Sequence, residues 1–272
     1  MAGGAHAGGA RTVSLADIAT PARAIGVILP SSNRTVERVT RAVLDDVPDT
    51  VACFTRVPYD HPPDGYHLAP FDAAAAMLAD ARVDAICWNA TRGALLGFEP
   101  DRKLCRRLTD ATGIPVITTA LATPTLLRAH GLTRIALITQ GDAAEARRLT
   151  ETFAAEGITL AAARALDVVD NFDAALVLAE RIRRFARELA TEASPDAILV
   201  WSTNLPGFDL AAGLEAETGI PIIDSCTVGV TAALAEIGAD TGRLATLGDH
   251  LMPPATTRND GATPSVGHLR ID

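Results

Sequence analysis

The sequence predicts an α/β protein of two similar lobes, each a parallel sheet flanked by helices, with the active site in the cleft between the lobes. Two observations predict this fold. Short apolar runs alternate with helical patterns along the chain, and continuous apolar strands joined by helices are typical of parallel sheets with right-handed crossovers. Short motifs also recur in the second half of the chain at nearly constant spacing, which indicates a duplicated unit.

Four strands are expected in the first half of the chain. Their apolar runs cover 24–30, 51–58, 83–89 and 113–119. Helices are expected between the strands, because 31–46 begins with cap residues and places Val36, Val39 and Val43 at helical spacing. Two further helices are expected over the alanine-rich 71–82 and over 100–112.

The second half repeats this alternation. Strands are expected over 134–139, 158–166, 196–202 and 219–225. Helices are expected over 142–156, over 172–192 and in a segment that ends at Thr218. The order of elements is therefore the same in both halves.

Three motifs match between the halves. Thr-Gly-Ile-Pro at 112–115 recurs at 218–221, an offset of 106 residues, and Asp-Ala-Ile at 84–86 recurs at 196–198, an offset of 112. The first strands, at Ile25 and Ile135, lie 110 residues apart. One such turn is common, but three matches in register predict two lobes related by a pseudo-twofold axis. The expected boundaries are a flexible tail 1–22, a first lobe 23–120 plus 222–250, a second lobe 121–221 and a flexible tail 251–272.

The composition excludes several classes of partner. With 24 Lys and Arg against 33 Asp and Glu, the formal net charge is −9, and no basic field is expected to hold nucleic acid or an anionic membrane. The longest uncharged run, 111–127, is too short to cross a bilayer. The first twenty residues lack the basic start and apolar block of a secretory signal. A cytoplasmic protein is therefore expected, and the sequence leaves open whether it forms a homo-oligomer.

The four cysteines and six histidines indicate neither a disulfide framework nor a metal site, because their spacing matches no zinc pattern. The chain also lacks the glycine-rich phosphate loops of nucleotide-binding proteins. We therefore expect no metal and no cofactor.

In open α/β sheets, ligands bind beyond the carboxyl ends of the strands. Two facing lobes would bring both sets of strand ends into one cleft, where small hydroxyls, amides, glycines and two arginines dominate. Several of these residues precede helices, whose free backbone N–H groups favour an anion such as a carboxylate. The expected substrate-binding residues are Ser31, Ser32, Asn33, Arg56, Asn89, Arg92, Gly141, Thr203, Asn204, Ser225 and Cys226.

Four motifs carry a resemblance to a known family: Pro-Ser-Ser-Asn at 30–33, Ala-Thr-Arg-Gly at 90–93, Ser-Thr-Asn at 202–204 and the two Thr-Gly-Ile-Pro turns. Over residues 25–247 the chain resembles the aspartate/glutamate racemase superfamily, in the branch of maleate cis-trans isomerase and arylmalonate decarboxylase. The resemblance implies a cofactor-independent isomerase or lyase. Such an enzyme would act on a small carboxylate or dicarboxylate through an enolate-like intermediate.

The resemblance also implies a catalytic position in each lobe. Racemases and maleate isomerases of this superfamily carry a cysteine at both positions, and the decarboxylase has a glycine at the first. Here Ala90 and Ser202 stand at these positions, and Gly141 replaces a tyrosine of the family. Alanine transfers no proton, so a two-thiol racemase is excluded. Ser202 would be the proton donor, and Thr91 would stabilise the intermediate.

The sequence alone leaves several alternatives open. Arg92 is either a solvated loop arginine or a clamp for a substrate carboxylate, whereas Arg56 is expected to serve function because family members often carry an arginine there. Cys226 is interpreted as a packed or lining residue. The alternative is a reactive thiol whose pKa the helix start would lower. The alternative for the whole protein is a carboxylate-binding protein that has lost catalysis together with its cysteines.

Overall fold

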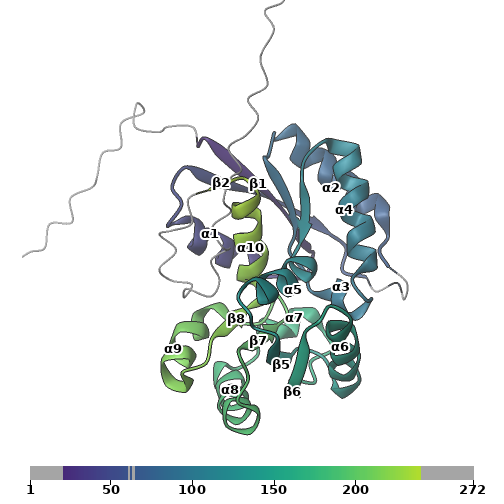
Figure 1. Cartoon of the computed structure of the whole chain (residues 1–272). Helices are drawn as coiled ribbons and strands as arrows, with labels where there is room; N and C mark the ends of the chain where they lie inside the picture. Colours follow the sequence, from purple (N-terminus) through teal and green to yellow (C-terminus); the bar gives the residue numbers. More distant parts are fainter. Residues whose placement is uncertain (1–20, 61, 63–64, 240–272) are drawn as a thin grey trace, which may run out of the picture.

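The structure is a computed structural model that describes residues 21–60, 62 and 65–239. Within these residues the chain folds into two parallel four-stranded sheets with helices packed around them (Figure 1). The predicted α/β class is confirmed. The expected tails 1–22 and 251–272 lie outside the described residues, except for Pro21 and Ala22.

The first half of the chain forms one sheet and its helices. Its elements are β1 (Arg23–Pro30), α1 (Val36–Leu44), β2 (Thr50–Val57), α2 (Leu68–Asp80), β3 (Ala85–Trp88), α3 (Arg92–Leu95), α4 (Glu99–Thr112), β4 (Val116–Thr118) and α5 (Thr119–Ala129). The strand order is β2-β1-β3-β4.

The second half forms the other sheet. Its elements are β5 (Arg134–Thr139), α6 (Ala143–Ala155), β6 (Thr159–Ala165), α7 (Asn171–Ala174), α8 (Ala179–Ala193), β7 (Ile198–Trp201), α9 (Phe208–Thr218), β8 (Ile222–Asp224) and α10 (Ser225–Glu236). The order β6-β5-β7-β8 is the order of the first sheet with every strand number raised by four.

The strand register reproduces the sequence repeat. One row of paired residues runs across three neighbouring strands of each sheet. The row is Gly26, Ile86 and Val116 on β1, β3 and β4, and Ala136, Ile198 and Ile222 on β5, β7 and β8. Equivalent members of the rows lie 110, 112 and 106 residues apart. These are the three offsets found in the sequence, so both halves use the same strand pairing.

The structure corrects the single helix expected over 172–192. It contains α7 and α8 instead, because Leu178 is extended where the helix would continue. Asn171 in α7 is buried and donates a hydrogen bond to Ser32 of the first half. In contrast, α8 buries Ile182 and Leu189 in the core of the second sheet. Because the two segments pack in different places, the chain turns between them.

Helix α5, which contains Pro124 in its interior, was not predicted from the sequence. Proline removes a backbone hydrogen bond and disfavours a helix interior. The helix forms nevertheless, because Ala120, Leu126 and Leu127 are buried in the core, and packing overrides local propensity. The side chain of Thr118 caps its start by accepting a hydrogen bond from the Leu121 N–H group.

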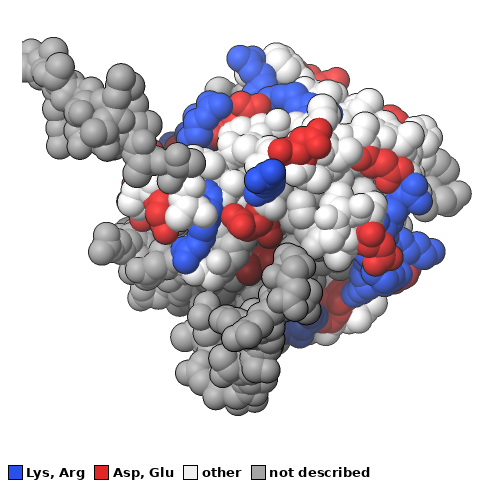
Figure 2. Space-filling model, turned by 90° about the horizontal axis from the view of Figure 1, so that it is seen from above, with Lys and Arg blue, Asp and Glu red and all other residues white. Residues whose placement is uncertain are grey.

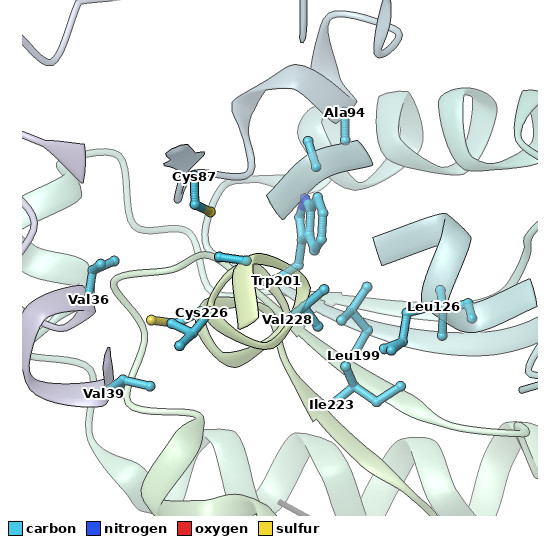
Figure 3. Packing of buried hydrophobic residues seen from close by; sticks show 14 of the residues in the cluster. Val36, Val39, Cys87, Ala94, Leu126, Leu199, Trp201, Ile223, Cys226 and Val228 are labelled. Atoms are coloured by element: carbon cyan, nitrogen blue, oxygen red, sulfur yellow. The ribbon is translucent and has the colours of Figure 1, made fainter. Parts of the chain in front are cut away.

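One buried cluster joins the two sheets, and two others lie on their outer faces. Along β1, Ile25, Val27 and Leu29 belong to the central cluster and Ile28 to an outer one, as the two-residue period of a strand requires. Figure 3 shows part of the central cluster, in which residues of β7 pack beside α10. The outer clusters lie beneath α2 and α4 and beneath α8 and α9.

The helix α10 connects the two sheets. It follows β8, which pairs with β7 in the second sheet, but it packs against α1, α5, β3 and β4 of the first half (Figure 1). The first lobe was expected to include 222–250. In the structure the strand at 222–224 lies in the second sheet, and the return to the first sheet begins with α10. The full division into lobes stays a prediction.

The surface mixes charges of both signs. On the face shown in Figure 2, acidic and basic side chains are interspersed, and pairs such as Arg107–Asp72 and Arg38–Asp209 link neighbouring elements. Of the helices in the described part of the chain, none is long and apolar enough to span a membrane. The cytoplasmic location and the absence of nucleic-acid partners stay predictions.

A row of aromatic rings packs where the two halves meet. Phe153 in α6 lies between Phe98 of the first half and Trp201 of β7, with ring centroids 5.6 and 5.2 Å away and steep interplanar angles. Both phenylalanines are almost fully buried. Edge-to-face contacts of this kind add to the stability from burial.

We expect Phe153→Ala to lower the free energy of unfolding by about 3–5 kcal/mol, because it leaves a cavity where the halves meet. The measurement is urea denaturation followed by circular dichroism. Phe172→Ala is the matched control, because this ring is 41% exposed, and its removal should cost about 1 kcal/mol or less. Equal losses in the two variants would contradict the role given to Phe153.

Candidate active site

A cavity of about 270 Å³ lies where the carboxyl ends of the strands of both sheets meet. It occupies the place where the sequence analysis put the cleft. Loops of both halves contribute to its wall. The lining residues are Pro30, Tyr59, Ala90, Thr91, Arg92, Leu95, Gln140, Gly141, Asp142, Glu145, Val168, Val169, Asn171, Trp201, Ser202 and Thr203.

Six of the residues singled out in the sequence line this cavity. They are Ala90, Thr91, Arg92, Gly141, Ser202 and Thr203. The others lie outside the wall and are Ser31, Ser32, Asn33, Arg56, Asn89, Asn204, Ser225 and Cys226. The structure therefore brings together the residues that follow β3, β5 and β7.

Ser202 directly follows β7 and is held by hydrogen bonds on several sides. Its hydroxyl donates to Gln140 Oε1 at 2.7 Å and accepts a bond from the Asn204 N–H group at 3.3 Å. Gln140 Nε2 donates a hydrogen bond to the Asp170 carbonyl, and this bond orients the amide. A neutral amide cannot take the hydroxyl proton, so Gln140 orients Ser202 without activating it as a nucleophile.

The loop after β3 depends on a glycine and a buried carboxyl group. A Cβ atom at Gly93 would lie 1.8 Å from Asp101 Oδ2, so no larger residue fits there. Asp101 is fully buried in α4 and accepts a hydrogen bond from the Tyr66 hydroxyl at 2.6 Å. Burial raises the pKa of Asp101 to about 6. The buried Asp101 side chain packs against Gly93 and so supports the loop that carries Ala90 and Thr91.

Arg92 is the one arginine of the cavity wall. Its guanidinium donates to the Pro62 carbonyl at 3.0 Å, and its buried Nε atom has no hydrogen-bond partner among the described residues. The structure therefore places a cation at the cavity, as a carboxylate clamp needs. Whether Arg92 binds substrate stays a prediction.

Glu145 was not identified from the sequence. Its Oε1 atom accepts hydrogen bonds from the Thr139 hydroxyl at 2.5 Å and from the Gly141 N–H group at 3.1 Å. A Cβ atom at Gly141 would lie 2.3 Å from Glu145 Oε2. The carboxylate thus fills the space that a side chain at position 141 would need. The Asp142-x-x-Glu145 spacing of a helix start, directly after a strand, could have indicated this glutamate.

Tyr59 and Asn171 also line the cavity and were missed. Both residues follow outer strands, Tyr59 after β2 and Asn171 after β6. None of the binding residues expected from the sequence lies in the loops after these strands. Burial raises the pKa of Tyr59 to about 12, with Arg92 opposing this shift and Glu145 adding to it. The hydroxyl of Tyr59 is therefore neutral at physiological pH, and it lies within electrostatic reach of both charges.

A buried hydrogen-bonded bridge connects the halves behind the cavity. Asn33 Nδ2 donates to Thr203 Oγ1 at 3.2 Å, and the Thr203 hydroxyl donates to the Asn89 carbonyl at 3.2 Å. Asn204 accepts a bond from the Arg34 N–H group at 2.8 Å. Asn33, Asn89 and Asn204 are 0–1% exposed, so in this structure they hold the loops together.

Arg56 holds the loop after β1 rather than the cavity wall. Its guanidinium donates to the carbonyl groups of Ser31 and Asn33 and forms an ion pair with Glu37 at 2.6 Å. The hydroxyl of Ser31 accepts a bond from the Tyr59 N–H group at 3.1 Å. A direct role of Arg56 in substrate binding stays a prediction that this geometry does not favour.

The structure corrects the electrostatics expected for Cys226. Its side chain is fully buried, and Figure 3 shows the sulfur pointing from α10 toward Val36 and Val39 of α1. Burial raises the pKa of the thiol well above its ordinary value, and nearby Asp224 raises it further. The expected lowering by the helix start is therefore wrong, because desolvation dominates. Ser225 is also buried, and its hydroxyl accepts a hydrogen bond from the Ser202 N–H group.

Metal ligands do not cluster in the part of the chain that the structure describes. Across 21–60, 62 and 65–239, no group of three His, Cys, Asp or Glu side chains is placed to hold an ion.

Comparison with known proteins identifies relatives over most of the chain. The sequence model of the arylmalonate decarboxylase family matches residues 64–248. A maleate isomerase of Nocardia farcinica (strain IFM 10152) is 28% identical in an alignment of 225 residues that covers 78% of this chain and 89% of that protein. The resemblance found in the motifs is confirmed.

Solved structures agree with this assignment. The maleate isomerase of Pseudomonas putida S16 with maleate has a TM-score of 0.73 at 25% identity and covers 83% of this chain and 98% of its own. A Nocardia farcinica maleate cis-trans isomerase with a covalently bound succinylcysteine intermediate has a TM-score of 0.69 at 26% identity, covering 80% and 93%. Unliganded arylmalonate decarboxylase, at 22% identity, TM-score 0.66 and coverage of 79% and 93%, shares the fold.

The buried carboxyl of Asp101 predicts a dependence of stability on pH. Its pKa is about 6 in the folded protein against an ordinary 3.8. Between pH values of about 4 and 6, the Asp101 carboxyl group is ionised in the unfolded chain but still protonated in the folded protein. The free energy of unfolding therefore falls as pH rises from about 4 to about 6 and stays lower above that.

We expect Asp101→Asn to remove this contribution. The free energy of unfolding of the variant, relative to that of the wild type, should therefore be higher at pH 7.5 than at pH 4 by up to about 3 kcal/mol. Urea denaturation at both pH values measures the difference. Asp110→Asn, at an exposed position of the same helix, is the control and should show no such gain. The same difference between Asp101→Asn and wild type at both pH values would refute the assignment.

Proposed function

The chain belongs to the arylmalonate decarboxylase family, and on that premise we propose that it is a cofactor-independent isomerase or decarboxylase that acts on a small carboxylate. The relatives named above are an isomerase and a lyase. The observation that carries the proposal is the cavity at the strand ends, whose wall contains Ala90 and Ser202 together. These are the positions that the family resemblance assigns to catalysis.

Within this pair of reactions, the residues favour decarboxylation. None of the residues that line the cavity is a cysteine, whereas one related maleate isomerase carries a covalent succinylcysteine. Addition of a thiolate to a double bond therefore has no nucleophile here. Decarboxylation needs no nucleophile, only an environment that stabilises the negative charge left behind.

The proposed step starts from a substrate with two carboxylates on one carbon. The bond to one carboxylate breaks, carbon dioxide leaves, and the electron pair remains as an enediolate on the other. Thr91 lines the cavity and, with backbone N–H groups, would donate hydrogen bonds to that charge. The Ser202 hydroxyl would protonate the carbon, because an enediolate is a stronger base than an alkoxide, and water would then restore the hydroxyl.

A second candidate is a protein that binds a small carboxylate without turning it over. Ala90 favours it, because this side chain contributes no chemistry, and so does Gln140, which cannot act as a base toward Ser202. Turnover separates the two candidates. A carboxylate that binds in the cavity and is never converted would support the second.

We expect Ser202→Ala to lower kcat/KM by about 100-fold or more on any substrate that the protein converts, because it removes the proton donor. The assay measures carbon dioxide release from aryl- and alkylmalonates and conversion of maleate to fumarate. Ser194→Ala is the control, because Ser194 ends α8 away from the cavity. Wild-type kcat/KM in Ser202→Ala would exclude Ser202 as the donor.

Thiol reagents should leave the activity intact. The side chains of Cys87 and Cys226 are fully buried, and burial raises the pKa of both thiols. We therefore expect iodoacetamide to leave turnover unchanged in the folded protein. Inactivation that disappears in Cys226→Ser would show instead that this thiol takes part in the reaction.

A further inference from the structure

The charges in the cavity wall are unbalanced. Of the residues that line it, one is a cation, Arg92, and two are carboxylates, Asp142 and Glu145. Among the ion pairs of the described residues, neither carboxylate takes part in one. The cavity itself therefore carries an excess of negative charge before any substrate enters.

Glu145 is held in place by neutral groups. Its Oε1 atom accepts from the Thr139 hydroxyl and the Gly141 N–H group, and neither donor cancels the negative charge. Its Oε2 atom occupies the space over Gly141, in the cavity wall. The absence of a side chain at Gly141 gives this oxygen its room. A carboxylate with two neutral donors on one oxygen is well suited to take a cationic donor on the other.

The second carboxylate, Asp142, lies three residues before Glu145. Asp142 caps α6, and its Oδ1 atom accepts a hydrogen bond from the Glu145 N–H group at 2.9 Å. Asp170 adds negative charge nearby, since it contributes with Glu145 to raising the pKa of Tyr59. The acidic groups thus lie on the side of the cavity formed by the second half, and Arg92 comes from the first half.

This arrangement disfavours a substrate that carries two carboxylates and no compensating positive charge. One carboxylate could pair with Arg92, but a second would approach Glu145 and Asp142, and like charges at contact distance repel. A protonated amine in the second position would gain charge-assisted hydrogen bonds instead. The cavity, about 270 Å³ with apolar walls at Leu95, Val168 and Val169, has room for an apolar substituent as well.

We propose that the site takes a zwitterionic substrate, with its carboxylate at Arg92 and a protonated amine at Glu145 and Asp142. This inference rests on the proposed function, because it names the ligand class of the same cavity. It narrows the small carboxylates considered above to those that also carry an amine. A malonate that the enzyme decarboxylates would then carry an amino group in addition to its two carboxylates.

The test compares two small ligands that differ in one charge. Succinate and β-alanine both carry a carboxylate on a two-carbon spacer, which ends in a second carboxylate in the first and in an ammonium group in the second. Isothermal titration calorimetry gives the Kd of each for the wild type, for Glu145→Gln and for Glu151→Gln. We expect the wild type to bind β-alanine at least about tenfold more tightly than succinate.

Glu145→Gln separates the charge of this residue from its structural role. The glutamine oxygen still accepts from Thr139 and Gly141, so the loop keeps its hydrogen bonds while the charge is lost. We expect the preference for β-alanine to fall by about tenfold. Glu151→Gln is the matched control, because Glu151 lies on α6 with its side chain 69% exposed and outside the cavity wall, and it should keep the wild-type preference.

Three outcomes would overturn the inference: succinate binding as tightly as β-alanine, an unchanged preference in Glu145→Gln, or no binding of β-alanine. The turnover assay separates this failure from failure of the proposed function. If malonate or maleate is converted while β-alanine does not bind, the enzyme assignment stands and the zwitterion is excluded. If β-alanine binds with the expected preference and no carboxylate is converted, the ligand class stands and the reaction is excluded.

Discussion

The buried hydrogen-bonded bridge between the halves is the constraint on which the cavity depends. Asn33, Thr203 and Asn89 form one chain of donors and acceptors away from water. A buried polar group without a partner costs about 1–3 kcal/mol, so the loops after β1, β3 and β7 must approach closely enough to satisfy one another. That approach sets the distance between the two sheets at their carboxyl ends. Ala90 directly follows Asn89 and Ser202 directly precedes Thr203, so both are positioned as a consequence.

The sequence predicted the repeated part of the fold well, because strand pairing follows from patterns that can be read along the chain. The offsets of 110, 112 and 106 residues reappear as equivalent rows of the two sheets. Local signals failed where packing overrules them. Pro124 concealed α5, although the repeat relates this helix to α10 through the same offset of 106. The apolar pattern over 172–192 gave no sign of the turn that lets Asn171 reach Ser32.

The residues of the cavity wall were predicted only in part, and the reason is physical. Position along the chain places Ala90 and Ser202 at strand ends, and both line the cavity. The direction of a side chain depends on tertiary contacts, which the spacing of residues along the sequence does not reveal. Glu145 turns back to the Gly141 N–H group and enters the wall, whereas the Cys226 side chain points into apolar packing against α1. Burial then reverses the expected direction of its pKa shift.

The path of α10 has a consequence for how the protein folds. Cys87 of β3 donates a hydrogen bond to the Gly229 carbonyl, and Asn89 donates to the Cys226 carbonyl, contacts that span 142 and 137 residues. During synthesis, the first sheet therefore has one inner face without its covering helix until the ribosome has completed nearly the whole second half. Contacts of such long sequence separation slow folding, and the exposed face is a site where a chaperone could bind the nascent chain. The two halves share a duplicated architecture, but the first cannot complete its folding before the second.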